Sequence, residues 1–232
     1  VGDYVVTPRH GKPVEINALW YNALKIMARL AEKYENKQLC RKYLEMAEKT
    51  KKSFDEKFYN EEKHCLYDVL GDSKVRPNQL FALSLSHPIV DNAEIAEQIL
   101  STVENKLLNK YGLKTLSSDE DGYVDVYEGS AYKRDSSYHQ GITWPWLLGL
   151  YYDALKNTMI IEKNRTKRQE LEEKITKLVY TTKETFKAEM FERSSIGTIS
   201  EIYDSTEPYE ERGAFAQAWS VAEIFRIVLN KR

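Results

Sequence analysis

The stretch Pro13–Tyr34 reads PVEINALWYNALKIMARLAEKY and decides the class of fold. Its large apolar side chains recur every three or four residues, which is the spacing of one face of an α-helix. Pro13 stands at a first-turn position, where its missing N–H group is not needed for a helical hydrogen bond. The pattern therefore predicts a helix over residues 13–34.

Six further segments show helical spacing. They cover residues 37–58, 80–85, 91–109, 139–156, 165–190 and 214–230. Asp91 with Glu94 predicts a capping box at the start of the fourth helix along the chain. Gly and Pro number only 10 and 6, so the turn-rich composition of β-sandwiches and barrels is missing. The sequence predicts an all-α protein with about seven helices and roughly 55–60% helix.

The helices fall into two kinds that alternate along the chain. Those over 37–58, 91–109 and 165–190 are charged on one face, whereas those near 13, 76, 139 and 214 are apolar around most of their circumference. The second kind should be buried more deeply. Each of them opens with an amide side chain, at Asn17, Gln79, Gln140 and Gln217, and these amides are 62, 61 and 77 residues apart.

This weak repeat of one outer and one inner helix predicts an α/α toroid, in which the inner helix N-termini gather at one polar mouth. A plain helical bundle that uses the amides as caps is the alternative. A closed ring of six helix pairs needs about twelve helices, so a toroid with about seven is incomplete.

Charge and composition exclude several functions. Lys and Arg number 34 against 36 Asp and Glu, and no run of like charge or long apolar segment suggests a nucleic-acid or membrane partner. Two Cys and four His show no metal-ligand spacing, so we expect no metal and no cofactor. No phosphate loop, zinc-protease motif or serine-hydrolase elbow is present. We expect a soluble, cytoplasmic protein.

Aromatic residues are abundant in a hydrophilic chain, with 16 Tyr, 7 Phe and 4 Trp at a mean hydropathy of −0.59. They fill helix interfaces in many proteins, but the stretch Arg134–Trp146 crowds Asp135, Tyr138, His139, Trp144 and Trp146 at a helix entrance. Such flat apolar faces beside polar groups suit a sugar. Two long acidic loops, 111–137 and 192–213, lead towards the same mouth and bring Glu201 with them.

Several segments together resemble the C-terminal glucosidase region of glycogen debranching enzymes. They are Thr7–Asn22, Arg76–Gln79, Tyr111–Ser117, Tyr138–Gly141, Trp144–Trp146, Ile199–Ile202 and Ala216–Ser220. The resemblance implies an (α/α)6 toroid that hydrolyses the α-1,6-linked glucose at a glycogen branch with inversion. It also implies that Glu201, in Ser-Glu-Ile, is the general base.

One departure from the family pattern bears on activity. The family's general acid is an Asp in a Thr-Trp-Met-Asp segment, which would stand just before the Val-Gly-Asp that opens this sequence. We therefore expect residues 1–232 to be the C-terminal portion of a single toroid glucosidase domain and the isolated chain to be nearly inactive. If an acid lies within these residues, Asp135 is the first candidate.

We expect the substrate, glycogen or another branched α-glucan, to contact residues that the four inner helices and the resemblance single out. These are Glu15, Asn17, Trp20, Gln79, Arg134, Asp135, Tyr138, His139, Gln140, Trp144, Trp146, Gln217 and Trp219. Inner helices without partners should leave apolar surface exposed, so the chain is expected to self-associate.

Two other functions fit parts of the pattern. A disaccharide phosphorylase with a related toroid would need a phosphate pocket, which the acidic loop around Glu201 disfavours. A non-catalytic glycan-binding module would keep the aromatic mouth and need no pair of carboxyl groups.

Overall fold

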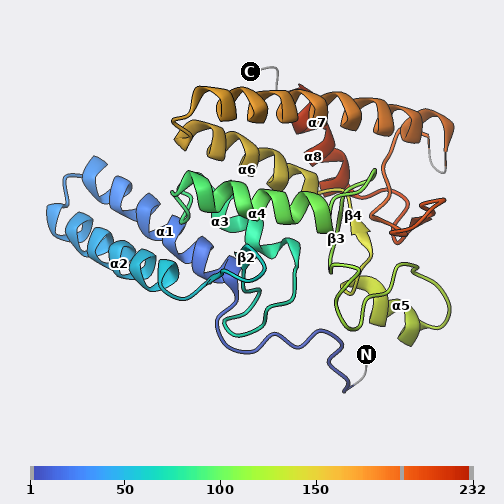
Figure 1. Ribbon diagram of the computed structural model, residues 1–232, viewed down its shortest axis with the longest axis horizontal. Coiled ribbons are helices and arrows are strands. Elements are labelled where there is room, and N and C mark those ends of the chain that lie inside the picture. Colours follow the sequence, from blue (N-terminus) through green and yellow to red (C-terminus); the bar gives the residue numbers. More distant parts are fainter. Residues whose placement is uncertain (1–2, 194–195, 230–232) are drawn as a thin grey trace.

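The computed structural model describes residues 3–193 and 196–229, and helices account for 55% of these residues (Figure 1). The helices are α1 (Val14–Lys33), α2 (Lys37–Asp55), the 3-10 helix η1 (Pro77–Leu80), α3 (Phe81–Ser84), α4 (Ala93–Lys106), α5 (Ala131–Tyr138), α6 (Leu147–Ile161), α7 (Arg165–Glu192) and α8 (Ala218–Leu229). The predominantly helical fold is as predicted.

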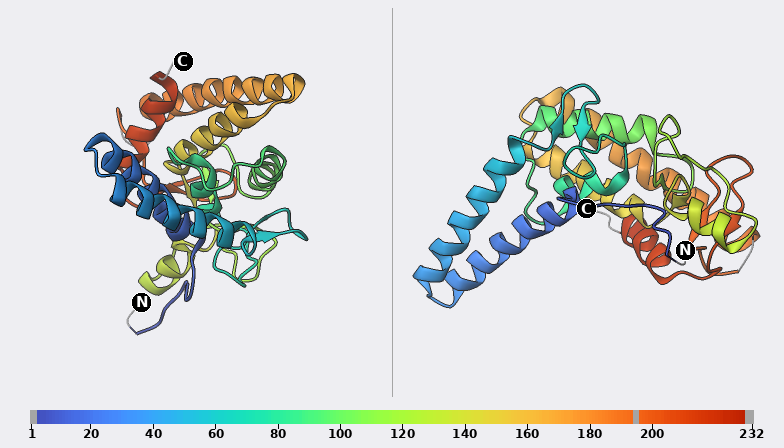
Figure 2. Two further views of the ribbon diagram at one scale, coloured as in Figure 1. Left: turned by 90° about the vertical axis from the view of Figure 1, so that its left-hand side faces the viewer. Right: turned by 90° about the horizontal axis from the view of Figure 1, so that it is seen from below.

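The helices form an inner row and an outer row. Along the inner row α1 packs on α3, α3 on α6 and α6 on α8, while α2 covers α1, α4 packs on α6, and α7 lies across α6 and α8. Figure 2 shows α1 and α2 projecting together to one side, away from α7 and α8. This alternation of inner and outer helices matches the predicted incomplete toroid.

The inner helices differ in how deeply they are buried. Helix α6 is the most enclosed, with Tyr151, Tyr152 and Leu155 among its buried side chains. Helix α1 buries one face and exposes its opposite apolar face. The buried face carries Val14, Ala18, Tyr21, Leu24, Ala28 and Ala31. Helix α1 is still buried more deeply than its outer partner α2, which buries only Ala47 and Phe54, as the sequence predicts.

Short strands, which the sequence did not indicate, join the loops. They are β1 (Tyr59–Asn60), β2 (Cys65–Leu66), β3 (Leu113–Lys114), β4 (Thr143–Trp144), β5 (Ile202–Tyr203) and β6 (Glu211–Arg212). Strands β1 and β2 form a hairpin, and β3-β4-β5-β6 form an antiparallel sheet in that order, with Leu113 opposite Trp144 and Tyr203 opposite Glu211. This sheet draws the two long acidic loops together.

The main differences from the predicted helices lie before α6 and at the start of α4. The helix expected over 139–156 begins only at Leu147, because Gly141 adopts φ +140° and the chain turns there into β4. Part of the expected loop before it forms α5. The cap of α4 is Asn92, whose side chain accepts from the backbone of Glu94, whereas Asp91 pairs with Lys51 at 2.8 Å. Among the described helices, none has the length and hydropathy to cross a membrane.

Candidate active site

Glu201 lies directly before β5, and three donors hold its carboxylate. The Tyr138 hydroxyl donates to Oε1 at 2.5 Å and the Gln217 amide to the same oxygen at 3.3 Å. The backbone N–H of Ala214 donates to Oε2 at 3.0 Å. A carboxylate oxygen accepts about two hydrogen bonds, so Oε1 is fully used and Oε2 keeps one acceptor position free.

The hairpin that carries Glu201 depends on a glycine. Gly213 has φ +70°, and a Cβ built there would stand 2.4 Å from Oε2 of Glu201. Only glycine lets the chain after β6 come close enough for Ala214 to reach the carboxylate. The backbone thus fixes one side of the carboxylate, and α5 and the start of α8 fix the other.

Aromatic rings line the space beside this carboxylate. The buried Trp144 ring stacks on His139 with centroids 5.4 Å apart and meets Tyr138 edge-on at 4.8 Å. Trp219 meets Trp144 at 5.9 Å and stacks on Trp146 at 5.5 Å. Trp219 is 46% exposed, so this aromatic wall presents an open flat face to solvent. Such a face suits stacking against the apolar side of a sugar ring.

Burial sets the protonation of two groups in the aromatic wall. Burial, and then the neighbouring Glu201, raise the pKa of the Tyr138 hydroxyl well above its ordinary value, so Tyr138 stays a donor. Burial, and then the positive charge of Arg76, lower the pKa of His139. His139 is therefore a neutral imidazole near pH 7 and can both donate and accept.

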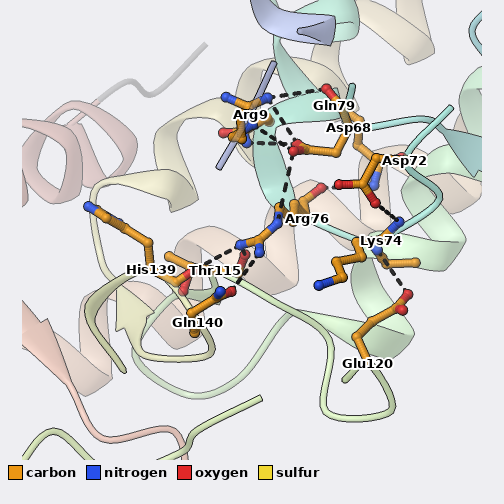
Figure 3. Close-up of polar contacts among 12 residues, drawn as sticks. Arg9, Asp68, Asp72, Lys74, Arg76, Gln79, Thr115, Glu120, His139 and Gln140 are labelled. Carbon is orange, nitrogen blue, oxygen red and sulfur yellow. Dashed lines mark hydrogen bonds and ion pairs between the residues drawn. The ribbon is translucent and has the colours of Figure 1, made fainter. Parts of the chain in front are cut away.

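A pocket of about 280 Å³ adjoins the wall and shares His139 with it; Thr7, Arg9, Arg76, Pro77, Asn78 and Thr115 complete its lining. Figure 3 shows that Asp68, which is only 2% exposed, lies between the two arginine side chains. Arg9 donates to Asp68 at 2.7 Å and to both oxygens of Glu15 at 2.6 and 2.7 Å, and Asn78 donates to Asp68 at 2.8 Å.

Arg76 connects this pocket to the aromatic wall. It donates to the backbone oxygens of Thr115 and His139 and, at 2.6 Å, to the side chain of Gln140 (Figure 3). Gln140 in turn donates to the backbone oxygen of Val6. Two guanidinium groups are thus balanced by the carboxylates of Asp68 and Glu15, and the pocket is polar without a net charge from these four groups.

Most of the residues expected at the mouth are found there, but not all. Tyr138, His139, Trp144, Trp146, Gln217 and Trp219 bond Glu201 or belong to the aromatic wall beside it, and Glu15 and Gln140 belong to the arginine network. Gln79, in contrast, is 1% exposed and bonds the backbone of Leu66 and Arg76. Its amide braces η1 against β2, so we do not include it among the proposed substrate contacts.

Among the residues that the structure describes, four others expected to contact substrate do not bond Glu201 and stand outside the aromatic wall, although the charge of Asp135 acts on Tyr138. Arg134 donates to the backbone of Gly129 and Asn17 to that of Pro13, so both brace their own helix starts. Trp20 is half exposed on the open face of α1. Asp135 is exposed on α5 one turn before Tyr138, and its charge contributes to the raised pKa of that hydroxyl.

The sequence reasoning missed Arg9, Asp68 and Arg76 as site residues. Arg9 and Arg76 stand in the segments Thr-Pro-Arg and Arg-Pro-Asn, where a charged residue beside a proline could have marked each of them as a site candidate. Asp68 gave none, because its partner Arg9 is 59 residues away. Among the residues that the structure describes, no group of three His, Cys, Asp or Glu is placed to hold a metal ion.

Comparison with known proteins adds a family and a fold. The model of the amylo-α-1,6-glucosidase family matches residues 1–226. A solved structure titled sialidase superposes on 96% of this chain and 20% of its own, with a TM-score of 0.70 and 13% identity. A GH63 mannosylglycerate hydrolase from Thermus thermophilus superposes on 94% of this chain and 45% of its own, with a TM-score of 0.59 and 11% identity. At such identities the likeness shows the fold alone, and the chain spans less than half of either structure.

Proposed function

Because this chain belongs to the amylo-α-1,6-glucosidase family, we propose that it forms the C-terminal part of a toroid domain that hydrolyses α-1,6-linked glucose in glycogen or another branched α-glucan. The observation that carries the proposal is the environment of Glu201. Its carboxylate is held by Tyr138, Gln217 and the backbone of Ala214 beside the aromatic wall.

In the proposed reaction Glu201 is the general base. The free acceptor position on Oε2 takes a hydrogen bond from a water molecule, and that water attacks the anomeric carbon as its proton passes to Oε2. A second carboxyl group protonates the leaving oxygen on the opposite side of the sugar. Following the resemblance, we assign this acid to an Asp upstream of Val1. Attack from the face opposite the leaving group inverts the anomeric configuration.

The arginine pocket supports a neutral sugar as the ligand. Asp68 and Glu15 compensate the charges of Arg9 and Arg76, and most of the guanidinium N–H groups donate to protein oxygens. A phosphate needs uncompensated positive charge or free donors, so this pocket favours hydrolysis over the phosphorylase alternative. A volume of about 280 Å³ suits a single sugar unit rather than a longer chain.

A glycan-binding module without activity is the second candidate for the isolated chain. The exposed face of Trp219 and a single held carboxylate at Glu201 are all that such a module requires. The two candidates differ in whether the carboxylate matters for turnover or only for affinity.

The decisive variant is Glu201→Gln, made in a polypeptide that also carries the segment upstream of Val1. We expect glucose release from branched limit dextrin to fall about 10²–10⁴-fold while affinity changes little, because the amide keeps its size but cannot take a proton. Glu207→Gln, an exposed residue of the same loop, is the matched control. Normal turnover by Glu201→Gln would overturn the assignment, and a parallel loss of affinity would favour the binding module.

A further inference from the structure

Two acidic side chains meet under the hairpin that carries Glu201. Glu189, in the last turn of α7, is 3% exposed, and its Oε1 accepts a hydrogen bond from Tyr203 at 2.9 Å. Its Oε2 and the Oε1 of Glu211 in β6 are both buried, and neither accepts a well-formed hydrogen bond. Both oxygens face the same atom, Nε of Arg193, at 3.7 and 2.8 Å.

Among the residues that the structure describes, Arg193 is the one cation that forms ion pairs with these two carboxylates. It caps the C-terminal end of α7, and its other nitrogens donate to the Tyr111 hydroxyl and the Tyr209 backbone. The rings of Tyr111 and Tyr203 stack 4.4 Å apart against the pair. Two ionised carboxylates beside one guanidinium would leave one buried negative charge uncompensated, which is strongly unfavourable.

We propose that Glu189 and Glu211 share one proton, and that the resulting hydrogen bond holds the β5–β6 hairpin against the end of α7. A proton between the two facing oxygens gives both a partner and reduces the pair to one negative charge, which Arg193 compensates. Burial raises the pKa of Glu189 to about 7, with the charge of Glu211 acting in the same direction, so the proton is held at neutral pH.

The pair bears on Glu201 through the hairpin. Glu201 precedes β5, and its donor Ala214 follows β6 by two residues, so both ends of the hairpin reach the carboxylate. Loss of the shared proton introduces repulsion between Glu189 and Glu211 and loosens the strand that presents Ala214. This link to activity rests on the proposed function, whereas the shared proton does not. Glu189 and Glu211 are thus positioning residues for Glu201.

Protonation then has a definite effect on stability. A folded-state pKa of about 7 lies above the ordinary Glu value of 4.5, so the folded protein binds more protons between these values. The contribution is present at low pH and lost as pH rises through 7. We expect this site to raise the unfolding equilibrium constant on the order of a hundredfold between pH 5 and pH 8.

The test uses Glu189→Gln in this same chain. The glutamine oxygen can accept from Tyr203 while its N–H donates to Glu211, so the variant copies the protonated state at every pH. Urea unfolding at pH 5, 6, 7 and 8 should show Glu189→Gln close to wild type at pH 5 and more stable at pH 8. Glu192→Gln, which removes an exposed charge of the same helix end, should keep the pH dependence of wild type.

Infrared spectroscopy gives an independent readout. The C=O band of a protonated carboxyl group should be present in wild type at pH 6, fade by pH 8.5 and be missing from Glu189→Gln. In urea unfolding, Glu211→Gln, whose amide can donate to Glu189 from the other side of the pair, should also be more stable than wild type at pH 8. If both glutamine variants are less stable than wild type at pH 8, or if Glu189→Gln keeps the pH dependence and the band of wild type, the proposal is wrong.

An activity measurement separates this inference from the proposed function. In a polypeptide that releases glucose, Glu189→Gln should extend activity to higher pH, while Glu192→Gln leaves the alkaline limb in place. A pH profile that does not move would contradict the link to Glu201. If no polypeptide releases glucose, the proposed function fails, and the unfolding and infrared results still decide whether the proton is shared.

Discussion

At the scale of single residues, the carboxylate of Glu201 is defined by what donates to it. The shortest hydrogen bond to this carboxylate is donated by Tyr138. Tyr138 belongs to α5, a helix that the sequence pattern did not indicate. A hydrogen bond to a charged group contributes about 1.5–3 kcal/mol. The orientation of the proposed base therefore depends on a residue 63 positions away along the chain.

Tyr138→Phe tests this dependence. We expect turnover to fall about 10–100-fold with little change in affinity, because the ring keeps its contacts with Trp144 and only the hydroxyl is lost. Tyr132→Phe, an exposed tyrosine on the same helix, is the control, and equal effects of the two variants would refute the role of Tyr138.

Asp68 gives a second prediction at this scale. Removing it leaves Arg9 and the buried Arg76 without their common counter-charge, which for a buried pair lowers stability by about 3–5 kcal/mol. Asp68→Ala should lower the free energy of unfolding in urea by that amount. Asp121→Ala, on an exposed loop, should stay within about 0.5 kcal/mol of wild type. A small change at Asp68 would show that the arginine network does not hold the pocket.

At the scale of elements, long helices could be predicted and short elements could not. Helices α1, α2, α4 and α7 repeat their apolar spacing over three turns or more, so their existence was predictable. Strands of two residues carry no alternation, and β3–β6 were missed for that reason. Trp144 stands three and four positions before Leu147 and Leu148, so it extends the helical spacing of α6 backwards, while Gly141 and Pro145 prevent a helix there.

The residues of the candidate site could be predicted only in part, because only some of them carry a local sequence signal. Trp146, Gln217 and Trp219 stand next to the starts of α6 and α8, where position in the sequence indicates position in space. Asp68, which pairs with Arg9 from 59 positions away, lies on a loop whose path depends on tertiary contacts, so no local pattern pointed to it.

Gly141 tests the account of the turn into β4. A Cβ there would stand 2.2 Å from the Val124 oxygen and 2.8 Å from the Tyr123 ring, at φ +140°. Gly122 also has a positive φ, but nothing lies within 4 Å of its Cβ position. Thermal unfolding should show Gly141→Ala less stable than Gly122→Ala by at least about 2 kcal/mol. Equal losses would mean that the close approach at Gly141 has no effect.

At the scale of the whole molecule, the two ends of the inner row remain uncovered. Helix α1 exposes Ile16, Trp20, Met27 and Leu30 along one face, with Trp20 at 50%, and α8 exposes Phe225 and Leu229. Soluble monomers rarely keep such aligned apolar faces open. We propose that the remaining helices of a complete toroid pack on these faces.

This predicts how the isolated chain behaves. Without other helices to cover α1, the chain should self-associate as its concentration rises, and light scattering should record the increase in mass. Replacing Met27 and Leu30 with Glu should reduce association, because it puts two charges into the exposed apolar face. Lys25→Glu changes charge on the same helix outside that group and serves as the control. A monomer over a wide concentration range would contradict the prediction.

The central claim is that Glu201 activates water for an inverting hydrolysis, and the configuration of the first glucose released tests it most directly. Proton NMR can follow the anomers formed from an α-1,6-branched dextrin by a polypeptide that includes the upstream segment. The account predicts that β-glucose appears first and that Glu201→Gln releases glucose at least about a hundredfold more slowly. Initial release of α-glucose, or turnover by Glu201→Gln close to that of wild type, would contradict it.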